Sequence, residues 1–417
     1  MQQSEIMPGL VLVTETLPFV RSVSIGFWIR AGVLYEPVRL QGVSHFLEHL
    51  LFKGTARRSA RDISESFDNI GGEINAYTAK EYTCLYAKIV DEHLEAAVDI
   101  LCDMIVSSRL DQADVIKEQN VVLEEISMYE DTPDEYVHDV LAQTIWPASP
   151  LGRSILGTRE SIAQLSAADI RSYYQERYTG ANMVIAAAGS VDHAELADLL
   201  AQRLQMPADQ AESATKSKPE FTPAYRLLEK PTEQLHLALG FPGLPIGDER
   251  RHTWSLLSNI LGAGMSSRLF QRLREDHGLV YNAYSYTASF GGAGYSAIYL
   301  GLSPQNVERA LQLIAEELAD LRSQPISEAE LRRAKEQAKG ALIMGMESTA
   351  NNMSRLGRGL LLNGRVRTVA ETVERIEAVT SDQLQRLAAE LYARRSMAAA
   401  AVGSVDGLTN LLETLAW

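Results

Sequence analysis

Cysteine is nearly absent from this 417-residue chain, which contains only Cys84 and Cys102 and no CxxC motif. A small scaffold held together by disulfides needs several cysteine pairs, so that class of protein is excluded. Such sparse cysteine is typical of a reducing compartment, and we expect the protein to be cytoplasmic.

Long apolar runs are absent as well. No stretch approaches the roughly 18 uninterrupted apolar residues that a membrane-spanning helix needs. The amino-terminal residues MQQSEIMPGLVLVTETLP also lack the basic region followed by an apolar region that marks a secretory signal. We therefore expect no membrane partner.

Basic residues are too few to balance the acidic ones, because 39 Lys and Arg stand against 54 Asp and Glu, for a formal net charge of −15. Nucleic acid phosphates bind to basic surfaces, so nucleic acid is excluded as the main partner. The acidic balance suits basic ligands, and solubility alone explains it equally well.

The length predicts two domains of about 200 residues each. Apolar and polar residues alternate over 22–30 as in a strand, and strand-like apolar runs recur at 83–90, 182–191, 233–241, 294–302 and 396–405. Between them, segments such as 91–108 and 166–178 repeat apolar residues at helical spacing. Sheet and helix should therefore mix in every part of the fold.

The chain also carries signs of an internal duplication. INAYT at 74–78 matches YNAYS at 281–285, KEQ at 117 matches KEQ at 335, and MVIAAAGSVD at 183 matches MAAAAVGSVD at 397. A stretch rich in Pro, Ala, Ser and Thr lies near the midpoint and is typical of a linker. We predict an α+β fold of two homologous domains, each a largely antiparallel sheet packed with helices, at 1–205 and 226–417, joined by a linker at 206–225.

The stretch VSHFLEHLLFKG, residues 43–54, places two histidines and a glutamate in an apolar run. Burying polar groups is costly unless something repays their desolvation. On a helix capped by Ser44, His45 and His49 would stand about 6 Å apart along the axis, so both could reach one metal ion. Glu48 would flank the same face, in the inverted zinc motif His-x-x-Glu-His. Two surface or core histidines are the alternative.

A catalytic zinc site needs a third protein ligand and an open position for water. Glu118 and Glu125 lie two helical turns apart within DVIKEQNVVLEEISMYED, so they share one face of a helix. Either glutamate alone would be an ordinary solvated residue, but together with the histidines they complete a candidate metal site.

These motifs resemble the pitrilysin (insulinase) family of zinc peptidases, in particular its short branch, the mitochondrial processing peptidase beta subunit and its bacterial homologues. In that family a glutamate ligand follows the histidine motif by about 75 residues, as Glu125 follows His49 here. The segments FDNIGGEINAYTAKEYTCLYAKI and LGAGMSSRLFQRLREDHGLVYNAYS also resemble family segments. The resemblance covers essentially the whole chain.

The resemblance implies a role for each motif residue. His45, His49 and Glu125 would bind zinc, which lowers the pKa of a water ligand, and Glu48 would take that water's proton as general base. Glu118 would orient a ligand from the second shell. Two residues of the second half, Arg274 and Tyr281, would reach across to grip the substrate backbone and stabilise the oxyanion.

Two further segments have both a functional and an ordinary interpretation. The strand that follows Gly71 and Gly72 could pair an extended substrate through its backbone, with Asn75 and Ala76 beside the cleaved bond, or it could be an interior strand. Residues 262–267 resemble the glycine-rich loop of the processing peptidase's noncatalytic subunit, and a plain turn between helices would look similar.

The duplication predicts one zinc ion per chain, because the positions equivalent to His49 and Glu125 in the second half are Leu256 and Ile343. Long family members join four domains around a closed chamber, so we expect a homodimer of this two-domain chain that admits unfolded peptides, basic ones included. The expected function is that of a zinc metalloendopeptidase. A noncatalytic scaffold, or a catalytic subunit that needs a different partner, are the alternatives.

Overall fold

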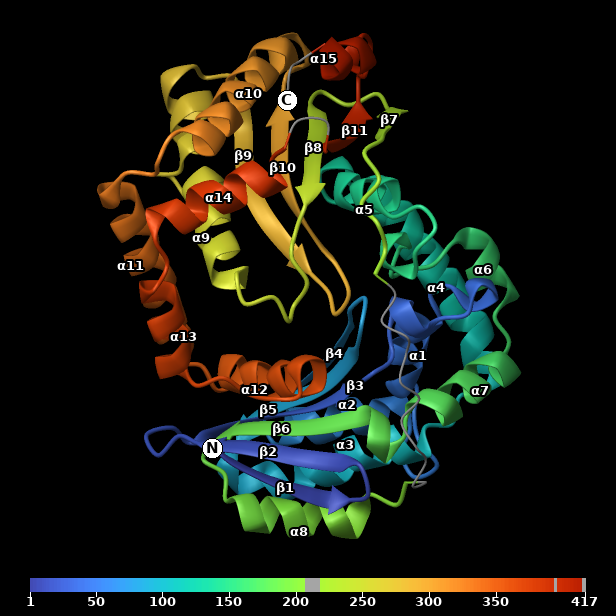
Figure 1. Cartoon of the computed structure of the whole chain (residues 1–417). Coiled ribbons are helices and arrows are strands. Elements are labelled where there is room, and N and C mark those ends of the chain that lie inside the picture. The colour runs from blue at the N-terminus through green and yellow to red at the C-terminus, as the bar shows by residue number, and fades with distance from the viewer. Residues whose placement is uncertain (207–217, 394–395, 415–417) are drawn as a thin grey trace. The chain divides into compact units, whose positions relative to one another are not determined.

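The computed structural model describes residues 1–206, 218–393 and 396–414. The chain forms two compact units, each built on one β-sheet (Figure 1). Among the described residues the first unit takes in 1–127, 154–206 and 344–367, and the second takes in 128–153, 218–343, 368–393 and 396–414. Both units combine helices with a mainly antiparallel sheet, so the predicted α+β class is confirmed.

The first sheet has six strands in the order β1-β2-β6-β3-β5-β4. Only β2 and β6 pair in parallel, and the other neighbours are antiparallel. The strand β4 forms one edge of this sheet. The bounds are β1 Gln2–Met7, β2 Leu10–Thr16, β3 Ser22–Ile29, β4 Glu73–Thr78, β5 Thr83–Val90 and β6 Met183–Gly189.

The second sheet has five strands in the order β7-β11-β8-β10-β9. Its one parallel pair, β7 with β11, occupies the same place as β2 with β6, so the order repeats β2-β6-β3-β5-β4 of the first sheet. This repetition agrees with the predicted duplication. The bounds are β7 Tyr225–Glu229, β8 Leu235–Pro242, β9 Val280–Ser289, β10 Gly294–Leu302 and β11 Ala398–Gly403.

Fifteen α-helices are assigned in the described part of the chain. Those before the midpoint are α1 Val43–Leu51, α2 Ala60–Asn69, α3 Leu94–Ser107, α4 Gln112–Glu130, α5 Pro133–Ile145, α6 Arg159–Gln164, α7 Ala167–Arg177 and α8 His193–Arg203. Those after it are α9 Arg251–Gly262, α10 Val307–Ser323, α11 Glu328–Gly345, α12 Thr349–Asn363, α13 Val369–Glu377, α14 Ser381–Leu391 and α15 Leu408–Thr414.

Each half of the sequence gives one helix to the other unit. The helix α5 follows α4 but packs on β8 and β11 of the second sheet, whereas α12 follows α11 but packs on β3 and β6 of the first. The KEQ match places α4 and α11 at equivalent points of the two halves. The exchange is therefore reciprocal.

The exchange changes the environment of β3. Its alternating pattern predicted a strand, which the structure contains, and both faces of this strand are buried, because α12 covers the side that carries Ser24 and Trp28. The hydroxyl of Ser24 lies 2.8 Å from that of Thr349. Trp28 packs so closely on Gly357 that a Cβ there would lie 2.2 Å from the indole nitrogen. The helix that covers this side of β3 comes from the far end of the sequence.

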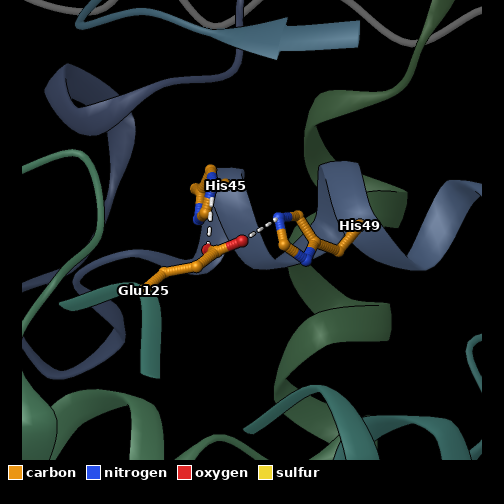
Figure 2. Close-up of side chains that lie close together, drawn as sticks. All are labelled: His45, His49 and Glu125. Carbon is orange, nitrogen blue, oxygen red and sulfur yellow. Dashed lines mark ion pairs between the residues drawn. The ribbon is translucent and has the colours of Figure 1, made fainter. Parts of the chain in front are cut away.

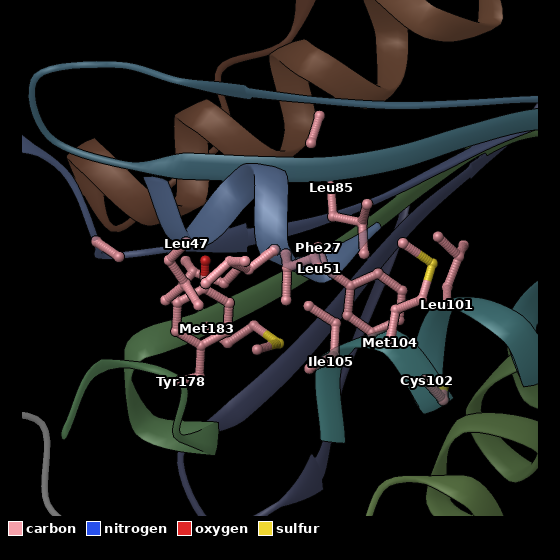
Figure 3. Close-up of a cluster of buried hydrophobic side chains, with 14 of the residues drawn as sticks. Phe27, Leu47, Leu51, Leu85, Leu101, Cys102, Met104, Ile105, Tyr178 and Met183 are labelled. Carbon is pink, nitrogen blue, oxygen red and sulfur yellow. The ribbon is translucent and has the colours of Figure 1, made fainter. Parts of the chain in front are cut away.

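The opposite face of the first sheet carries the main core of its unit. Figure 3 shows part of this cluster, in which Phe27 and Leu85 of the sheet are buried together with Leu47 of α1 and Leu101 and Ile105 of α3. Burial of such large apolar side chains contributes about 1.5–3 kcal/mol each. The helix α1 is therefore anchored by its apolar face.

The compact units are discontinuous in the sequence, so no single cut separates them. The predicted domains 1–205 and 226–417 are each continuous in the sequence, and their bounds remain a prediction. Residues 207–217, the greater part of the predicted linker 206–225, lie outside the described residues.

Candidate metal centre

The helix α1 carries the His-x-x-Glu-His motif and begins two residues earlier than the sequence predicted. Its first residue is Val43, and Ser44 is not its cap. The buried carboxylate of Glu36 accepts hydrogen bonds from the backbone N–H groups of Gly42 (2.8 Å) and Ser44 (2.9 Å). This carboxylate therefore satisfies orphan donors at the helix start, and the hydroxyl of Ser44 is left to bond Tyr173.

The helix α4 supplies the two glutamates that the sequence predicted. Val122 and Ile126 are buried and hold the helix against the core, and Glu118 is buried beside them. The Glu125 side chain is 36% exposed. The apolar spacing of α4 thus turns both carboxylates towards α1.

His45, His49 and Glu125 come together in the first unit (Figure 2). One ligand atom from each lies within 4.8 Å of the other two. Glu125 Oε2 lies 3.8 Å from His45 Nε2, and Glu125 Oε1 lies 3.6 Å from His49 Nε2. The family resemblance implied that these three residues act together, and the structure places their side chains in one cluster.

The cluster fits a zinc ion in donor type and in size. Two imidazoles and one carboxylate form a usual catalytic zinc set, and ligands about 2.1 Å from a tetrahedral ion lie about 3.4 Å apart. Glu125 Oε2 is buried and has no hydrogen-bond partner among the described residues. An oxygen that serves as a metal ligand is expected to lack such a partner. Among the described residues this is the one group of three such side chains that could hold a metal.

The protonation of the site favours metal binding. Burial, with a smaller contribution from the charge of His49, lowers the pKa of His45 to about 4. His45 is therefore neutral near pH 7, as a ligand must be. Its Nδ1 has no hydrogen-bond partner among the described residues.

Glu48 lies on the same helix as the two histidines, and its carboxylate is held by Thr78 of β4. The Thr78 hydroxyl donates to Glu48 Oε2 at 2.5 Å. Burial raises the pKa of Glu48, the Thr78 hydrogen bond and the charge of His49 oppose this, and the charge of Glu125 adds to it. Thr78 belongs to the INAYT segment, but nothing in the sequence indicated that it contacts Glu48.

Glu118 contacts His49 rather than the site of the ion. Its Oε2 lies 3.0 Å from His49 Nδ1, and its Oε1 lies 2.6 Å from Lys53 Nζ. A carboxylate that accepts from Nδ1–H fixes the tautomer that leaves Nε2 free for a metal. The Lys53 contact was not predicted, because a lysine just after a helix is usually a solvated residue.

Asn75 and Ala76 lie in β4, the edge strand of the first sheet, opposite Tyr86 and Leu85 of β5. Asn75 is exposed, and its side-chain oxygen accepts from the N–H of Ala76 at 2.8 Å. The alternative of an interior strand is wrong, since one side of β4 has no neighbouring strand in the described sheet. Thr78, at the end of the same strand, links this edge to Glu48.

Arg274 and Tyr281 belong to the second unit and lie next to each other there. The Arg274 guanidinium carbon lies 5.2 Å from the ring centre of Phe270 and 5.9 Å from that of Tyr281. Tyr281, near the start of β9, is 72% exposed. The pair is thus stacked and accessible. Leu256 and Ile343, the equivalents of two ligands, lie in α9 and α11.

Models of peptidase family M16 match the chain over most of its length. The model described as insulinase (peptidase family M16) covers residues 11–159, which include the metal cluster, and the model described as peptidase M16 inactive domain covers residues 164–338. A relative in Bacillus subtilis, named an uncharacterized zinc protease, is 44% identical over 384 residues, which are 92% of this chain and 94% of the relative.

Solved structures share the fold. A protease from Helicobacter pylori superposes with a TM-score of 0.90 at 19% identity, over 96% of this chain and 99% of that one. A chain of complex III from Candida albicans, solved with Inz-5 bound, gives 0.88 at 20% identity over all of both chains.

The fold and the matching family models define one class of protein, the M16 peptidase fold. This chain belongs to peptidase family M16, the insulinase or pitrilysin family, as its motifs predicted. The described ranges contain no helix that is both long and apolar enough to cross a membrane.

Proposed function

We propose that this chain is a zinc-dependent metalloendopeptidase. The observation that carries the proposal is the convergence of His45, His49 and Glu125, with the carboxylate of Glu48 on the same helix. The name of the Bacillus subtilis relative, a zinc protease, supports the choice of metal. We assign His45, His49 and Glu125 as ligands of one zinc ion per chain.

When bound, zinc would polarise the peptide carbonyl and lower the pKa of a water ligand. Glu48 is the general base that accepts the proton of the attacking water and later returns it to the leaving amine. Because Thr78 bonds Oε2, Oε1 is the atom that carries this proton. The raised pKa of the partly buried Glu48 carboxyl suits a group that must both take and release a proton.

The substrate is an extended peptide that adds to the free edge of β4. Backbone pairing provides affinity with little demand on sequence, and Asn75 and Ala76 lie on this edge. We assign Arg274 and Tyr281 to binding of the substrate backbone and to stabilisation of the oxyanion. Their stacked, accessible arrangement supports this assignment.

The wider setting follows from charge and from the family. We propose that a homodimer encloses a chamber that admits unfolded peptides, including presequence-like segments. The net charge of −15 favours basic ones. The two unpaired cysteines favour a cytoplasmic location.

A second candidate is a noncatalytic scaffold or one subunit of a heterodimeric processing peptidase. The observation that favours it is the structural likeness to a chain of complex III. The complete set of three candidate ligands and a base favours catalysis instead.

The test measures bound zinc and cleavage of a panel of basic peptides, with and without chelator. Wild type should hold one zinc per chain and cleave, and Glu48→Gln should keep the zinc while losing at least about 100-fold in kcat. Glu124→Gln, an exposed neighbour of Glu125 on α4, is the matched control and should stay active. A wild type that binds zinc but cleaves nothing until a second protein is added supports the heterodimer. Unchanged cleavage by Glu48→Gln overturns the mechanism.

A further inference from the structure

The stretch VSHFLEHLLFKG ends in the turn that follows α1. Lys53 lies in this turn and is not one of the candidate metal ligands. We propose that Lys53 is a positioning residue for the metal centre, which acts by holding Glu118 in the orientation that fixes His49. This inference rests on the proposed zinc site.

The contacts form a chain from the turn to the ligand. Lys53 Nζ lies 2.6 Å from Glu118 Oε1, and Glu118 Oε2 lies 3.0 Å from His49 Nδ1. Because each carboxylate oxygen has its own partner, the carboxylate plane cannot rotate without losing one contact. His49 Nδ1 then donates to Glu118, and its Nε2 faces Glu125 at 3.6 Å.

The two charges lie in very different environments. The Glu118 side chain is 5% exposed and that of Lys53 is 37% exposed. A buried carboxylate is costly without a counter-charge and hydrogen bonds. Lys53 provides both from the solvent side, so the carboxylate can stay beside the histidine.

The backbone of the turn is firmly held, so the lysine stem starts from a fixed point. The N–H of Lys53 donates to Leu50 O at 3.1 Å, and Lys53 O accepts from the Arg109 side chain at 3.0 Å. Gly54 has a φ of 120°, and a Cβ there would lie 2.8 Å from the carbonyl oxygen of Arg58. Glycine is therefore required at this close approach, and the turn presents Lys53 in one direction.

Two effects of Lys53 on zinc oppose each other. Its positive charge repels a cation, but the carboxylate between them neutralises most of that repulsion. Its hold on Glu118 preserves the orientation of a ligand, and loss of such outer partners typically weakens metal affinity about 10- to 100-fold. Since Lys53 acts one contact further out, we expect its loss to weaken zinc binding about 3- to 10-fold.

A merely structural ion pair predicts a different result. It would change the melting temperature without changing the ligand geometry. The test therefore uses zinc affinity, measured by competition with a chelator, and the visible absorption of the cobalt-substituted protein, which reports ligand geometry.

Lys53→Met removes the charge and keeps an unbranched apolar stem, whereas Lys53→Arg keeps a donor. Lys117→Met is the matched control, because Lys117 precedes Glu118 on α4 but is 75% exposed and pairs loosely with Asp114 at 3.8 Å. We expect weaker zinc binding and an altered cobalt spectrum for Lys53→Met, recovery of both in Lys53→Arg, and no change in Lys117→Met. Lys53→Gln serves in its place if Lys53→Met does not fold.

A double-mutant cycle tests whether Lys53 acts through Glu118. In a Glu118→Gln background, Lys53→Met should weaken zinc binding less than twofold further. Equal zinc affinity and identical cobalt spectra for wild type and Lys53→Met overturn the inference and leave the zinc site standing. A wild type that binds no zinc overturns the proposed function itself.

Discussion

The hydroxyl of Thr78 donates a hydrogen bond of 2.5 Å to Oε2 of Glu48, so the edge strand β4 is tied directly to the helix that carries the histidine motif. The Thr78 oxygen also lies 3.3 Å from that of Thr83, which donates to the carbonyl oxygen of Ala31 at 2.8 Å. The orientation of Glu48 is thus set by the sheet.

Thr78→Val should lower kcat about tenfold, because it leaves Oε2 of a partly buried carboxylate without its donor, a loss of about 1–3 kcal/mol. Valine keeps the branched shape, so the fold and the zinc content should be unchanged. Steady-state cleavage of one peptide, with metal analysis of the same samples, measures both.

Thr78→Ser is the control for this hydrogen bond. Serine keeps the hydroxyl and should retain most of the activity. If Thr78→Val and Thr78→Ser cleave equally fast, the hydrogen bond does not orient the base.

Removal of zinc should destabilise the protein. A ligand that binds only the folded state stabilises it by about 2.7 kcal/mol at a free concentration 100 times its dissociation constant. Chelator should therefore lower the melting temperature by several degrees, and added zinc should restore it.

The ligand variant His45→Ala provides the comparison for zinc removal. Its melting temperature should respond little to chelator, because it has already lost one ligand of the three. An equal response in wild type and His45→Ala would place the stabilising ion elsewhere.

The helix of the histidine motif and the shared faces of its candidate ligands could be predicted from the sequence because they depend on local periodicity, whereas the choice of Glu125 as third ligand came from the family resemblance. His45 and His49 are one turn apart, and Glu118 and Glu125 are two turns apart, so the helix itself puts each pair on one face. The matched strands β6 and β11 were visible for a different reason, because their sequences repeat.

The partners of these residues could not be predicted, because they come from distant segments with ordinary patterns. In the sequence, Thr78 has the pattern of a strand residue, Lys53 that of a solvated residue and Glu36 that of a loop residue. Their hydrogen-bond and ion-pair partners are visible only in the folded structure. The helix exchange was missed for a related reason. The apolar faces of α5 and α12 indicate burial but not the sheet that buries them.

His138 should make the second unit less stable in mild acid. Its two ring nitrogens lie 2.8 Å from the hydroxyl of Tyr286 and 3.0 Å from that of Tyr284. Burial lowers the pKa of His138 below its usual 6.5, although the charges of Asp139 and Asp134 oppose the shift. The folded state therefore prefers the neutral ring.

The sign of the pH dependence follows from that preference. The stabilising contribution of neutral His138 is complete above pH 6.5 and is lost as the pH falls through the lower folded pKa. We expect the free energy of unfolding, measured with urea at pH 7.5, 6.5 and 5.5, to fall less with decreasing pH for His138→Gln than for wild type. If the free energy of unfolding falls equally in both proteins, His138 does not contribute to the loss of stability in acid.

The exchanged helices predict that neither half of the chain folds well alone. A fragment of residues 1–206 lacks α12 and would leave one face of its sheet uncovered, including Val13, Trp28 and Val184. A fragment of residues 218–417 lacks α5, which covers β8 and β11. Exposed apolar faces of this kind promote aggregation.

Each fragment expressed alone should therefore be insoluble or bind a hydrophobic dye, whereas co-expressed fragments should purify as one soluble complex, since each carries the helix that the other needs. The dependence arises because α5 and α12 each pack on the sheet formed by the opposite half. A monomeric 1–206 fragment that unfolds cooperatively and binds no dye would show that α12 is dispensable. In that case the burial of Trp28 against Gly357 would contribute little to the stability of the first unit.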